Sequence, residues 1–186
     1  MQTVVALTEE QYKNIIMYAQ TGFTGFKPNK QLATALQLEA NLGMRISDIL
    51  KLKLNQIIQD GNRYRLNVIE QKTGKLRTFT VPMQIYQFIY IYCLENNIAP
   101  NEQIFKMKTR NAQQLLKKIV DFLGYKNIST HSFRKFFATN IYNNNNKDIL
   151  LVQELLQHAS AKTTQRYINI SRVAIEKALE ENIHLI

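Results

Sequence analysis

The sequence predicts a mainly α-helical protein with one small antiparallel β-sheet insertion. Apolar residues recur at helical spacing before residue 55 and after residue 82, whereas between these positions they alternate with polar residues in the manner of strands. A chain of 186 residues is long enough for one well-buried core, so we expect a single domain over residues 1–186.

Capping signals define the first two predicted helices. Thr8 and Gln11 form a capping-box pattern, and the helix that follows them should end at Gly22. The stretch KQLATALQLEANL consists largely of strong helix formers and stops at Gly43, the residue type best suited to end a helix.

A short third helix, with Ser47 as its N-cap, should lead into the sheet. RYRLNVIEQ and LRTFTVP have the alternation of strands, and the sequences DGN and KTGK are typical of the turns beside them. Helical patterns then resume at 83–96, 109–123, 130–142, 147–157 and 172–182, with Pro100, Gly124 and the NNNN run as breaks.

Composition favours a polyanionic partner. Lys and Arg number 24 against 14 Asp and Glu, which gives a net charge of +10 and a pI near 9.7. Nucleic acid is the leading candidate, and an anionic membrane surface is the alternative. No stretch approaches the roughly 18 apolar residues of a spanning helix, and the N-terminus does not resemble a signal peptide, so we expect a soluble, cytoplasmic protein.

Cys93 is the one cysteine of the sequence and lies in the apolar run IYQFIYIYCLE. A single cysteine cannot form an internal disulfide or a cysteine-based zinc site, so we predict a reduced thiol in the core.

Two pairs of residues are candidates for chemistry. His131 and Arg134 stand three positions apart, so on a helix they share a face and could both reach one phosphate, although an ordinary basic helix has the same spacing. His158 precedes Tyr167 in a polar, Thr-rich segment, where a half-exposed tyrosine without a catalytic role is the ordinary alternative. Neither pair identifies an active site by itself.

Five stretches, taken in order, resemble the catalytic domain of the tyrosine recombinases, the phage integrase family. They are NLGMRISDILKLK, EQKTGKLRTFTVP, THSFRKFFATNIY, ELLQHAS and TTQRYINIS, and the resemblance runs from about Leu7 to Ser171. It implies six catalytic residues: Arg45, Lys72, His131, Arg134, His158 and Tyr167. Two positions depart from the family: Gln157 replaces a usual glycine, and Lys135 stands where histidine is frequent.

The resemblance implies that Arg45 and Arg134 hold a DNA phosphate. An arginine fork gives two parallel hydrogen bonds to phosphate oxygens and keeps its charge, which suits the negative charge that builds up during attack on phosphorus. We expect Asp48, three positions after Arg45, to orient that arginine.

Tyr167 is implied as the nucleophile, and since a free phenol has a pKa of about 10 it needs a proton acceptor. His131 is the implied base, and His158 the implied hydrogen-bond donor to the phosphate. Lys72 is the implied general acid that protonates the departing 5′ oxygen, with its neighbour Lys75 as the alternative.

The implied activity is cleavage and rejoining of DNA through a 3′-phosphotyrosyl intermediate, which requires neither a metal nor another cofactor. Lys75, Arg77 and Lys135 are expected to contact DNA. The resemblance further implies a homotetramer on paired recombination sites and a monomer without DNA. A type IB topoisomerase and a non-catalytic DNA-binding regulator are the alternative functions.

Family members commonly carry core-binding and arm-binding domains ahead of the catalytic domain, and we recognise neither in this sequence. Residues 172–186 are amphipathic, so we expect a C-terminal helix there that protomers could exchange on DNA.

Overall fold

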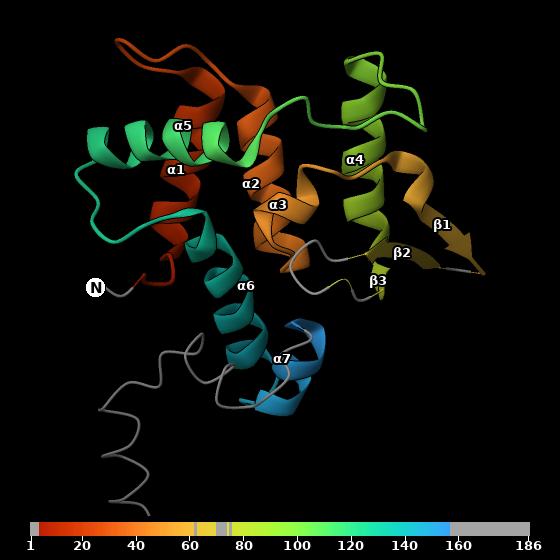
Figure 1. Ribbon diagram of the computed structural model, residues 1–186. Helices are drawn as coiled ribbons and strands as arrows, with labels where there is room; N and C mark the ends of the chain where they lie inside the picture. Colours follow the sequence, from red (N-terminus) through yellow and green to blue (C-terminus); the bar gives the residue numbers. More distant parts are fainter. Residues whose placement is uncertain (1–3, 62, 70–73, 75, 157–186) are drawn as a thin grey trace, which may run out of the picture. The chain divides into compact units, whose positions relative to one another are not determined.

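The computed structural model describes residues 4–61, 63–69, 74 and 76–156 (Figure 1). In chain order its elements are α1 (Glu9–Thr21), α2 (Lys30–Leu42), α3 (Ile46–Ile49), the 3-10 helix η1 (Leu54–Gln56), β1 (Ile57–Asp60), β2 (Arg63–Ile69), β3 (Leu76–Val81), α4 (Met83–Glu95), α5 (Thr109–Phe122), α6 (Thr130–Asn144) and α7 (Ile149–Leu156). The predicted fold class, mainly α with a small antiparallel sheet, is confirmed. The helix predicted at 172–182 lies outside the described residues.

The chain divides into two compact units, residues 1–137 and residues 138–186. Helix α6 begins in the first unit and ends in the second. The described part of the second unit contains the end of α6 and α7, and Asp148 caps α7 by accepting hydrogen bonds from the backbone N–H groups of Leu150 and Leu151 at 2.9 and 3.0 Å.

The predicted caps of the first two helices are present. The Thr8 hydroxyl accepts from the Gln11 N–H at 3.1 Å, while the Gln11 side chain accepts from the Thr8 N–H at 3.0 Å. Gly22 ends α1, and Gly43 ends α2 in the left-handed conformation with φ of 61°.

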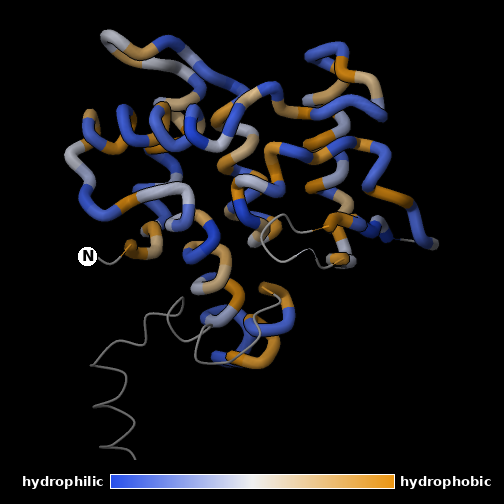
Figure 2. Tube along the Cα trace, viewed as in Figure 1, coloured by the Kyte–Doolittle hydropathy of each residue, from blue (hydrophilic) through white to orange (hydrophobic). Residues whose placement is uncertain are grey.

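Helix α2 is the buried centre of the first unit. Nine of its thirteen residues are buried, and it contacts α1, α3 and α5. Figure 1 shows α1 and α2 running alongside one another with α5 crossing them. Helix α5 buries Ala112, Leu116, Ile119 and Val120 and exposes the polar residues between them, an alternation that Figure 2 shows along its length.

The sheet has the strand order β1-β2-β3, with both pairs antiparallel. Leu66 and Val68 of β2 face inward, whereas Arg65 and Ile69 are exposed. Helix α4 packs against β2, with the rings of Tyr64 and Tyr86 stacked 3.8 Å apart between centroids. The sheet therefore has one covered and one open face, as its alternating sequence predicts.

Three further predictions concern individual residues of the first unit. Gly61 makes the predicted turn between β1 and β2 at φ of 58°. Cys93 is buried in α4 as predicted, and burial raises the pKa of its thiol. The prediction that Ser47 is an N-cap is wrong, because α3 already begins at Ile46, whose N–H is bound by the side chain of Glu39.

The later helix boundaries lie close to the predicted ones. Helix α6 continues to Asn144, two residues beyond the predicted end at 142, so it includes the first half of the NNNN run. None of the helices in the described ranges is long and apolar enough to cross a membrane.

Candidate active site

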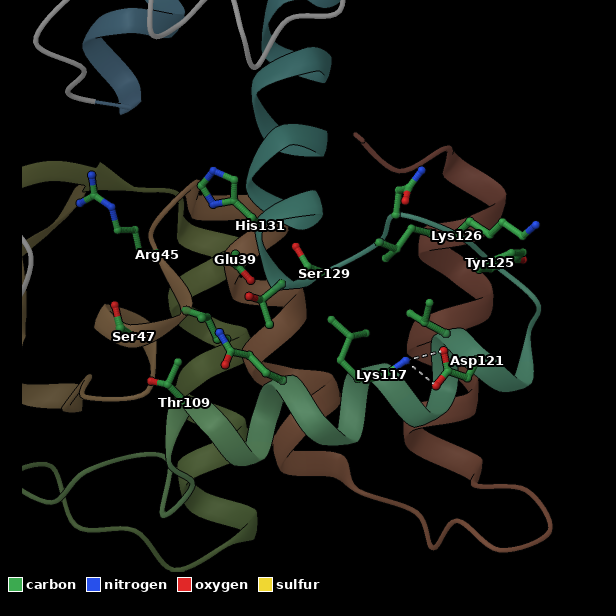
Figure 3. A pocket seen from close by; sticks show the side chains of 17 residues that line it. Glu39, Arg45, Ser47, Thr109, Lys117, Asp121, Tyr125, Lys126, Ser129 and His131 are labelled. Atoms are coloured by element: carbon green, nitrogen blue, oxygen red, sulfur yellow. Dashed lines mark hydrogen bonds and ion pairs between the residues drawn. The ribbon is translucent and has the colours of Figure 1, made fainter. Parts of the chain in front are cut away.

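A pocket of about 800 Å³ lies in the first unit. Its wall comes from the start of α3, one side of α5, the segment from Tyr125 to Ser129 and the first turn of α6. Figure 3 shows Arg45 and His131 at one end of this pocket, and Lys117, Asp121 and Tyr125 at the other. The pocket thus joins a cationic end to a wall rich in polar groups.

Arg45 owes its place to the end of α2. Gly43 takes the left-handed conformation that closes this helix, and Arg45 then occupies the N-cap position of α3 with extended backbone angles (φ −74°, ψ 144°). Its side chain does not cap the helix by a hydrogen bond and is partly exposed, which leaves it on the pocket wall. Asp48 is buried in the same short helix, and its role in orienting Arg45 stays a prediction.

His131 lies in the first turn of α6. The N–H of Ser129, just before the helix, donates to the hydroxyl of Ser132 at 3.1 Å, a local bond that favours a helix start at this point. His131 is partly exposed and lines the pocket together with Arg45, although the two residues come from distant parts of the chain.

Arg134 follows on α6 at i+3 but is fully buried, with an exposed fraction of 0%. Its Nη1 donates to the backbone carbonyl of Gly43. Arg134 thus contacts the turn between α2 and α3, residues 43–46, which also carries Arg45. We call this segment the α2–α3 turn.

Glu39 completes this arrangement and lines the same pocket. Its exposed fraction is 1%, and burial raises the pKa of its carboxyl well above the usual range. The positive charge of Arg134 and a hydrogen bond from the Ile46 N–H act in the opposite direction and favour the ionised form.

The structure brings Arg45 and His131 together in one pocket, as expected for residues that share a phosphate. Arg134 lies one turn further along α6 and is not exposed on the pocket wall. Lys72, His158 and Tyr167, together with the alternative acid Lys75, lie outside the described residues, so their predicted roles stay predictions.

Two predicted DNA contacts lie in described backbone. Arg77 belongs to β3, where it is paired with Val68 of β2. The ammonium of Lys135 donates to the Val4 carbonyl at 2.6 Å, and burial lowers its pKa. Lys135 therefore ties the N-terminal segment to α6, and its predicted contact with DNA stays a prediction.

Sequence reasoning missed Glu39. Its signal was an acidic residue in the run LATALQLEANL, where leucine and alanine recur on several faces of one helix. A helix that is apolar around most of its circumference is buried, and a carboxylate within it must meet compensating groups. Which groups these are depends on α6, which is distant in the sequence.

Comparison with known sequences agrees with this site. The family model described as "Phage integrase family" matches residues 6–172. The chain is similar to the "Probable integrase/recombinase YoeC" of Bacillus subtilis, with 34% identity over 137 residues, covering 70% of this chain and 72% of that protein. It is also similar to the tyrosine recombinase XerA of Pyrococcus furiosus, with 28% identity, covering 94% of this chain but only 60% of the relative.

Solved structures share the fold. A crystal structure of XerA recombinase superposes with a TM-score of 0.70 at 18% identity, covering 99% of this chain and 66% of that one. The catalytic domain of bacteriophage HP1 integrase gives a TM-score of 0.65 at 20% identity, covering 96% of this chain and 95% of that domain. The fold of the chain is therefore that of these catalytic domains.

Proposed function

The chain belongs to the phage integrase family, and on this premise we propose that it is the catalytic part of a site-specific tyrosine recombinase that cleaves and rejoins DNA. The observation that supports the proposal best is the meeting of Arg45 and His131 in one pocket. The two stretches that carry them resemble the family's catalytic boxes, and the fold brings both to one place.

A phosphodiester suits this pocket electrostatically. Attack at phosphorus adds negative charge to the nonbridging oxygens, and a cation that is already in place stabilises this charge without reorganisation. Arg45 supplies such a cation at the pocket wall, and the net charge of +10 draws DNA toward the protein. Arg134 is proposed as the second cation, held close to the same turn by the Gly43 carbonyl.

The proposed reaction balances without a further reactant. The hydroxyl oxygen of Tyr167 forms a bond to phosphorus, and the bond from phosphorus to the 5′ oxygen breaks. His131 takes the phenolic proton, Lys72 gives a proton to the departing 5′ oxygen, and His158 donates a hydrogen bond to the phosphate. The 3′-phosphotyrosyl link conserves the energy of the broken bond, so the reverse reaction rejoins a strand.

The proposed partner is double-stranded DNA carrying two recombination sites. Similar folds have been solved on DNA, among them XerH recombinase bound to its difH substrate, with a TM-score of 0.68 at 20% identity. We propose that four protomers assemble on paired sites and that the protein is monomeric without DNA. The chain spans 60% of the XerA relative, so the activity of a whole recombinase is part of this proposal.

The first test is covalent capture of DNA. The protein is mixed with nicked duplexes of randomised sequence in the presence of EDTA, and the strands that resist extraction under denaturing conditions are sequenced. We expect a covalent complex on a defined sequence motif. Tyr167→Phe should abolish the complex while leaving DNA binding unchanged, because only the nucleophilic oxygen is removed.

Controls separate the alternatives. Covalent complex that persists in Tyr167→Phe would contradict the assigned nucleophile, and a strict requirement for magnesium would contradict the mechanism. A type IB topoisomerase would also form a complex, so the captured sequence is then placed twice in one plasmid. A recombinase exchanges strands between the two copies, whereas a topoisomerase only relaxes the plasmid.

A further inference from the structure

Glu39 is the acidic side chain on the wall of the pocket next to the two arginines, and it is almost fully buried. One of its carboxylate oxygens, Oε2, has no hydrogen-bond partner. A buried carboxylate costs free energy that leucine or methionine at the same position would not. The residue is therefore expensive for the fold, which raises the question of what it does.

Three contacts connect Glu39 with the α2–α3 turn. Its backbone carbonyl accepts from the Gly43 N–H at 3.0 Å, and its carboxylate accepts from the Ile46 N–H. The Gly43 carbonyl in turn accepts from Arg134, whose charge attracts the carboxylate. Glu39 thus holds both ends of the turn, while the turn holds Arg134.

The bond to Ile46 replaces a missing local cap. Arg45 occupies the N-cap position of α3, where serine or aspartate would normally bind the free N–H groups of the first turn. The arginine side chain makes no such bond, so it remains available to the pocket. Glu39, reaching across from α2, supplies the acceptor that a local cap would have provided.

We propose that Glu39 is a positioning residue of the active site, which fixes the α2–α3 turn and thereby sets the positions of Arg45 and Arg134 for the phosphate. The role rests on the proposed function, because it gives the two arginines one phosphate to act on. The carboxylate does not touch the substrate. It acts through the backbone of the turn and through its attraction for Arg134.

The test compares two substitutions at this position. Glu39→Met keeps the approximate volume but removes both the acceptor and the charge, whereas Glu39→Gln keeps an acceptor for the Ile46 N–H. The initial rate of covalent complex formation is measured on the duplex selected by covalent capture, over a range of DNA concentrations. We expect Glu39→Met to lower the rate at saturating DNA about tenfold or more, with the half-saturating concentration changed less than about threefold. Glu39→Gln should recover at least half of this loss on a logarithmic scale.

A second readout does not depend on catalysis. The side-chain N–H signal of Arg134 is followed by nitrogen-15 NMR and assigned by its loss in Arg134→Lys. We expect it to shift in Glu39→Met, because the guanidinium loses both its attracting charge and the fixed Gly43 carbonyl. Thr34→Val is the matched control, since Thr34 is a buried polar residue of the same helix that lines a different pocket with α4. It should leave the rate and the Arg134 signal unchanged.

The outcomes distinguish this proposal from the function on which it rests. If the unmodified protein forms no covalent complex, the proposed function is wrong, and the Arg134 signal still decides whether Glu39 positions that arginine. A Glu39→Met protein that melts like the unmodified one, cleaves at its rate and keeps the Arg134 signal would show that Glu39 only fills space. Should Glu39→Met fail to fold, Glu39→Gln decides: an unshifted signal with an unchanged rate overturns the proposal.

Discussion

Helices α2 and α4 have the same length of thirteen residues, yet their environments are opposite to what their compositions suggest. Helix α4 reads MQIYQFIYIYCLE, with its one charged residue at the end, but buries only Ile89, Tyr92 and Cys93. Helix α2 carries a lysine, a glutamate and several amides, but buries nine residues, Glu39 among them.

The difference shows that neighbours decide burial. Helix α2 contacts α1, α3 and α5, whereas α4 contacts mainly β2 and η1 and leaves Tyr90, Ile91 and Leu94 exposed. An apolar residue at an exposed position costs little, because much of any protein surface is apolar. A charged residue at a buried position costs much more, so Glu39 is the more informative of the two exceptions.

The largest expected effect comes from cutting back a leucine in each helix. Leu36→Ala in α2 removes a side chain with an exposed fraction of 0% and should destabilise the fold by about 2–5 kcal/mol, through lost burial and the cavity left behind. Leu94→Ala in α4, where 59% of the residue is exposed, should cost about 0.5 kcal/mol or less. Urea denaturation of both variants measures the two free energies of unfolding. Equal losses would mean that the outer side of α4 is covered in solution.

Two glycines provide the next comparison. Gly43 and Gly61 both have positive φ, at 61° and 58°, so alanine costs about 1 kcal/mol of backbone strain at either position. At Gly43 a Cβ would also lie within 2.5 Å of two ring carbons of Phe137, whereas at Gly61 it would meet no atom within 4 Å. We therefore expect Gly43→Ala to cost about 2–4 kcal/mol in the same denaturation experiment and Gly61→Ala about 1 kcal/mol.

A result in which both glycine variants lose the same amount would contradict close packing of α6 on the α2–α3 turn. Gly43→Ala should also slow DNA cleavage, because the carbonyl that binds Arg134 belongs to the substituted residue. Gly61→Ala, in a turn at the edge of the sheet, is the control for that measurement as well.

Local signals predicted local structure well. The capping box of Thr8 and Gln11 and the helix end at Gly43 depend on neighbours within four residues, and both are present as predicted. Ser47 failed as an N-cap because the acceptor that starts α3 comes from Glu39, outside the window that a cap pattern covers. Burial failed as a guide for α4, because composition does not state how many elements pack around a helix.

The candidate site divides in the same way. The resemblance identified Arg45 and His131 by their boxes, and the structure brings them into one pocket. It did not identify Glu39, which belongs to none of the residues implied by the resemblance and is recognisable only from its contacts with the α2–α3 turn. A residue that acts through the backbone of others leaves no motif of its own.

The smallest expected effect is a pH dependence of stability that belongs to Glu39. Burial raises the pKa of this carboxyl above its unfolded value of 4.5, so between the two values the folded protein binds more protons than the unfolded one. The contribution of Glu39 to stability is therefore fully present below pH 4.5 and is lost as the pH rises through the folded pKa. Glu39→Gln has no such titration, so it should gain stability relative to the unmodified protein over this window.

Thermal or urea unfolding of the two proteins at a series of pH values measures that difference, and all ionisable groups common to both cancel. Its slope should not exceed about 1.4 kcal/mol per pH unit, the limit for one proton. Arg45 and Arg134 stay charged throughout, but His131 lines the same pocket and histidine changes charge in this pH range, so the pair is measured again with His131→Gln in both proteins. A difference that survives this change and levels off at high pH belongs to Glu39. A difference that is flat from pH 4 upward would mean that the carboxyl titrates as it does in the unfolded chain, and that the acidic residue in α2 costs the fold no more than the exposed apolar residues of α4.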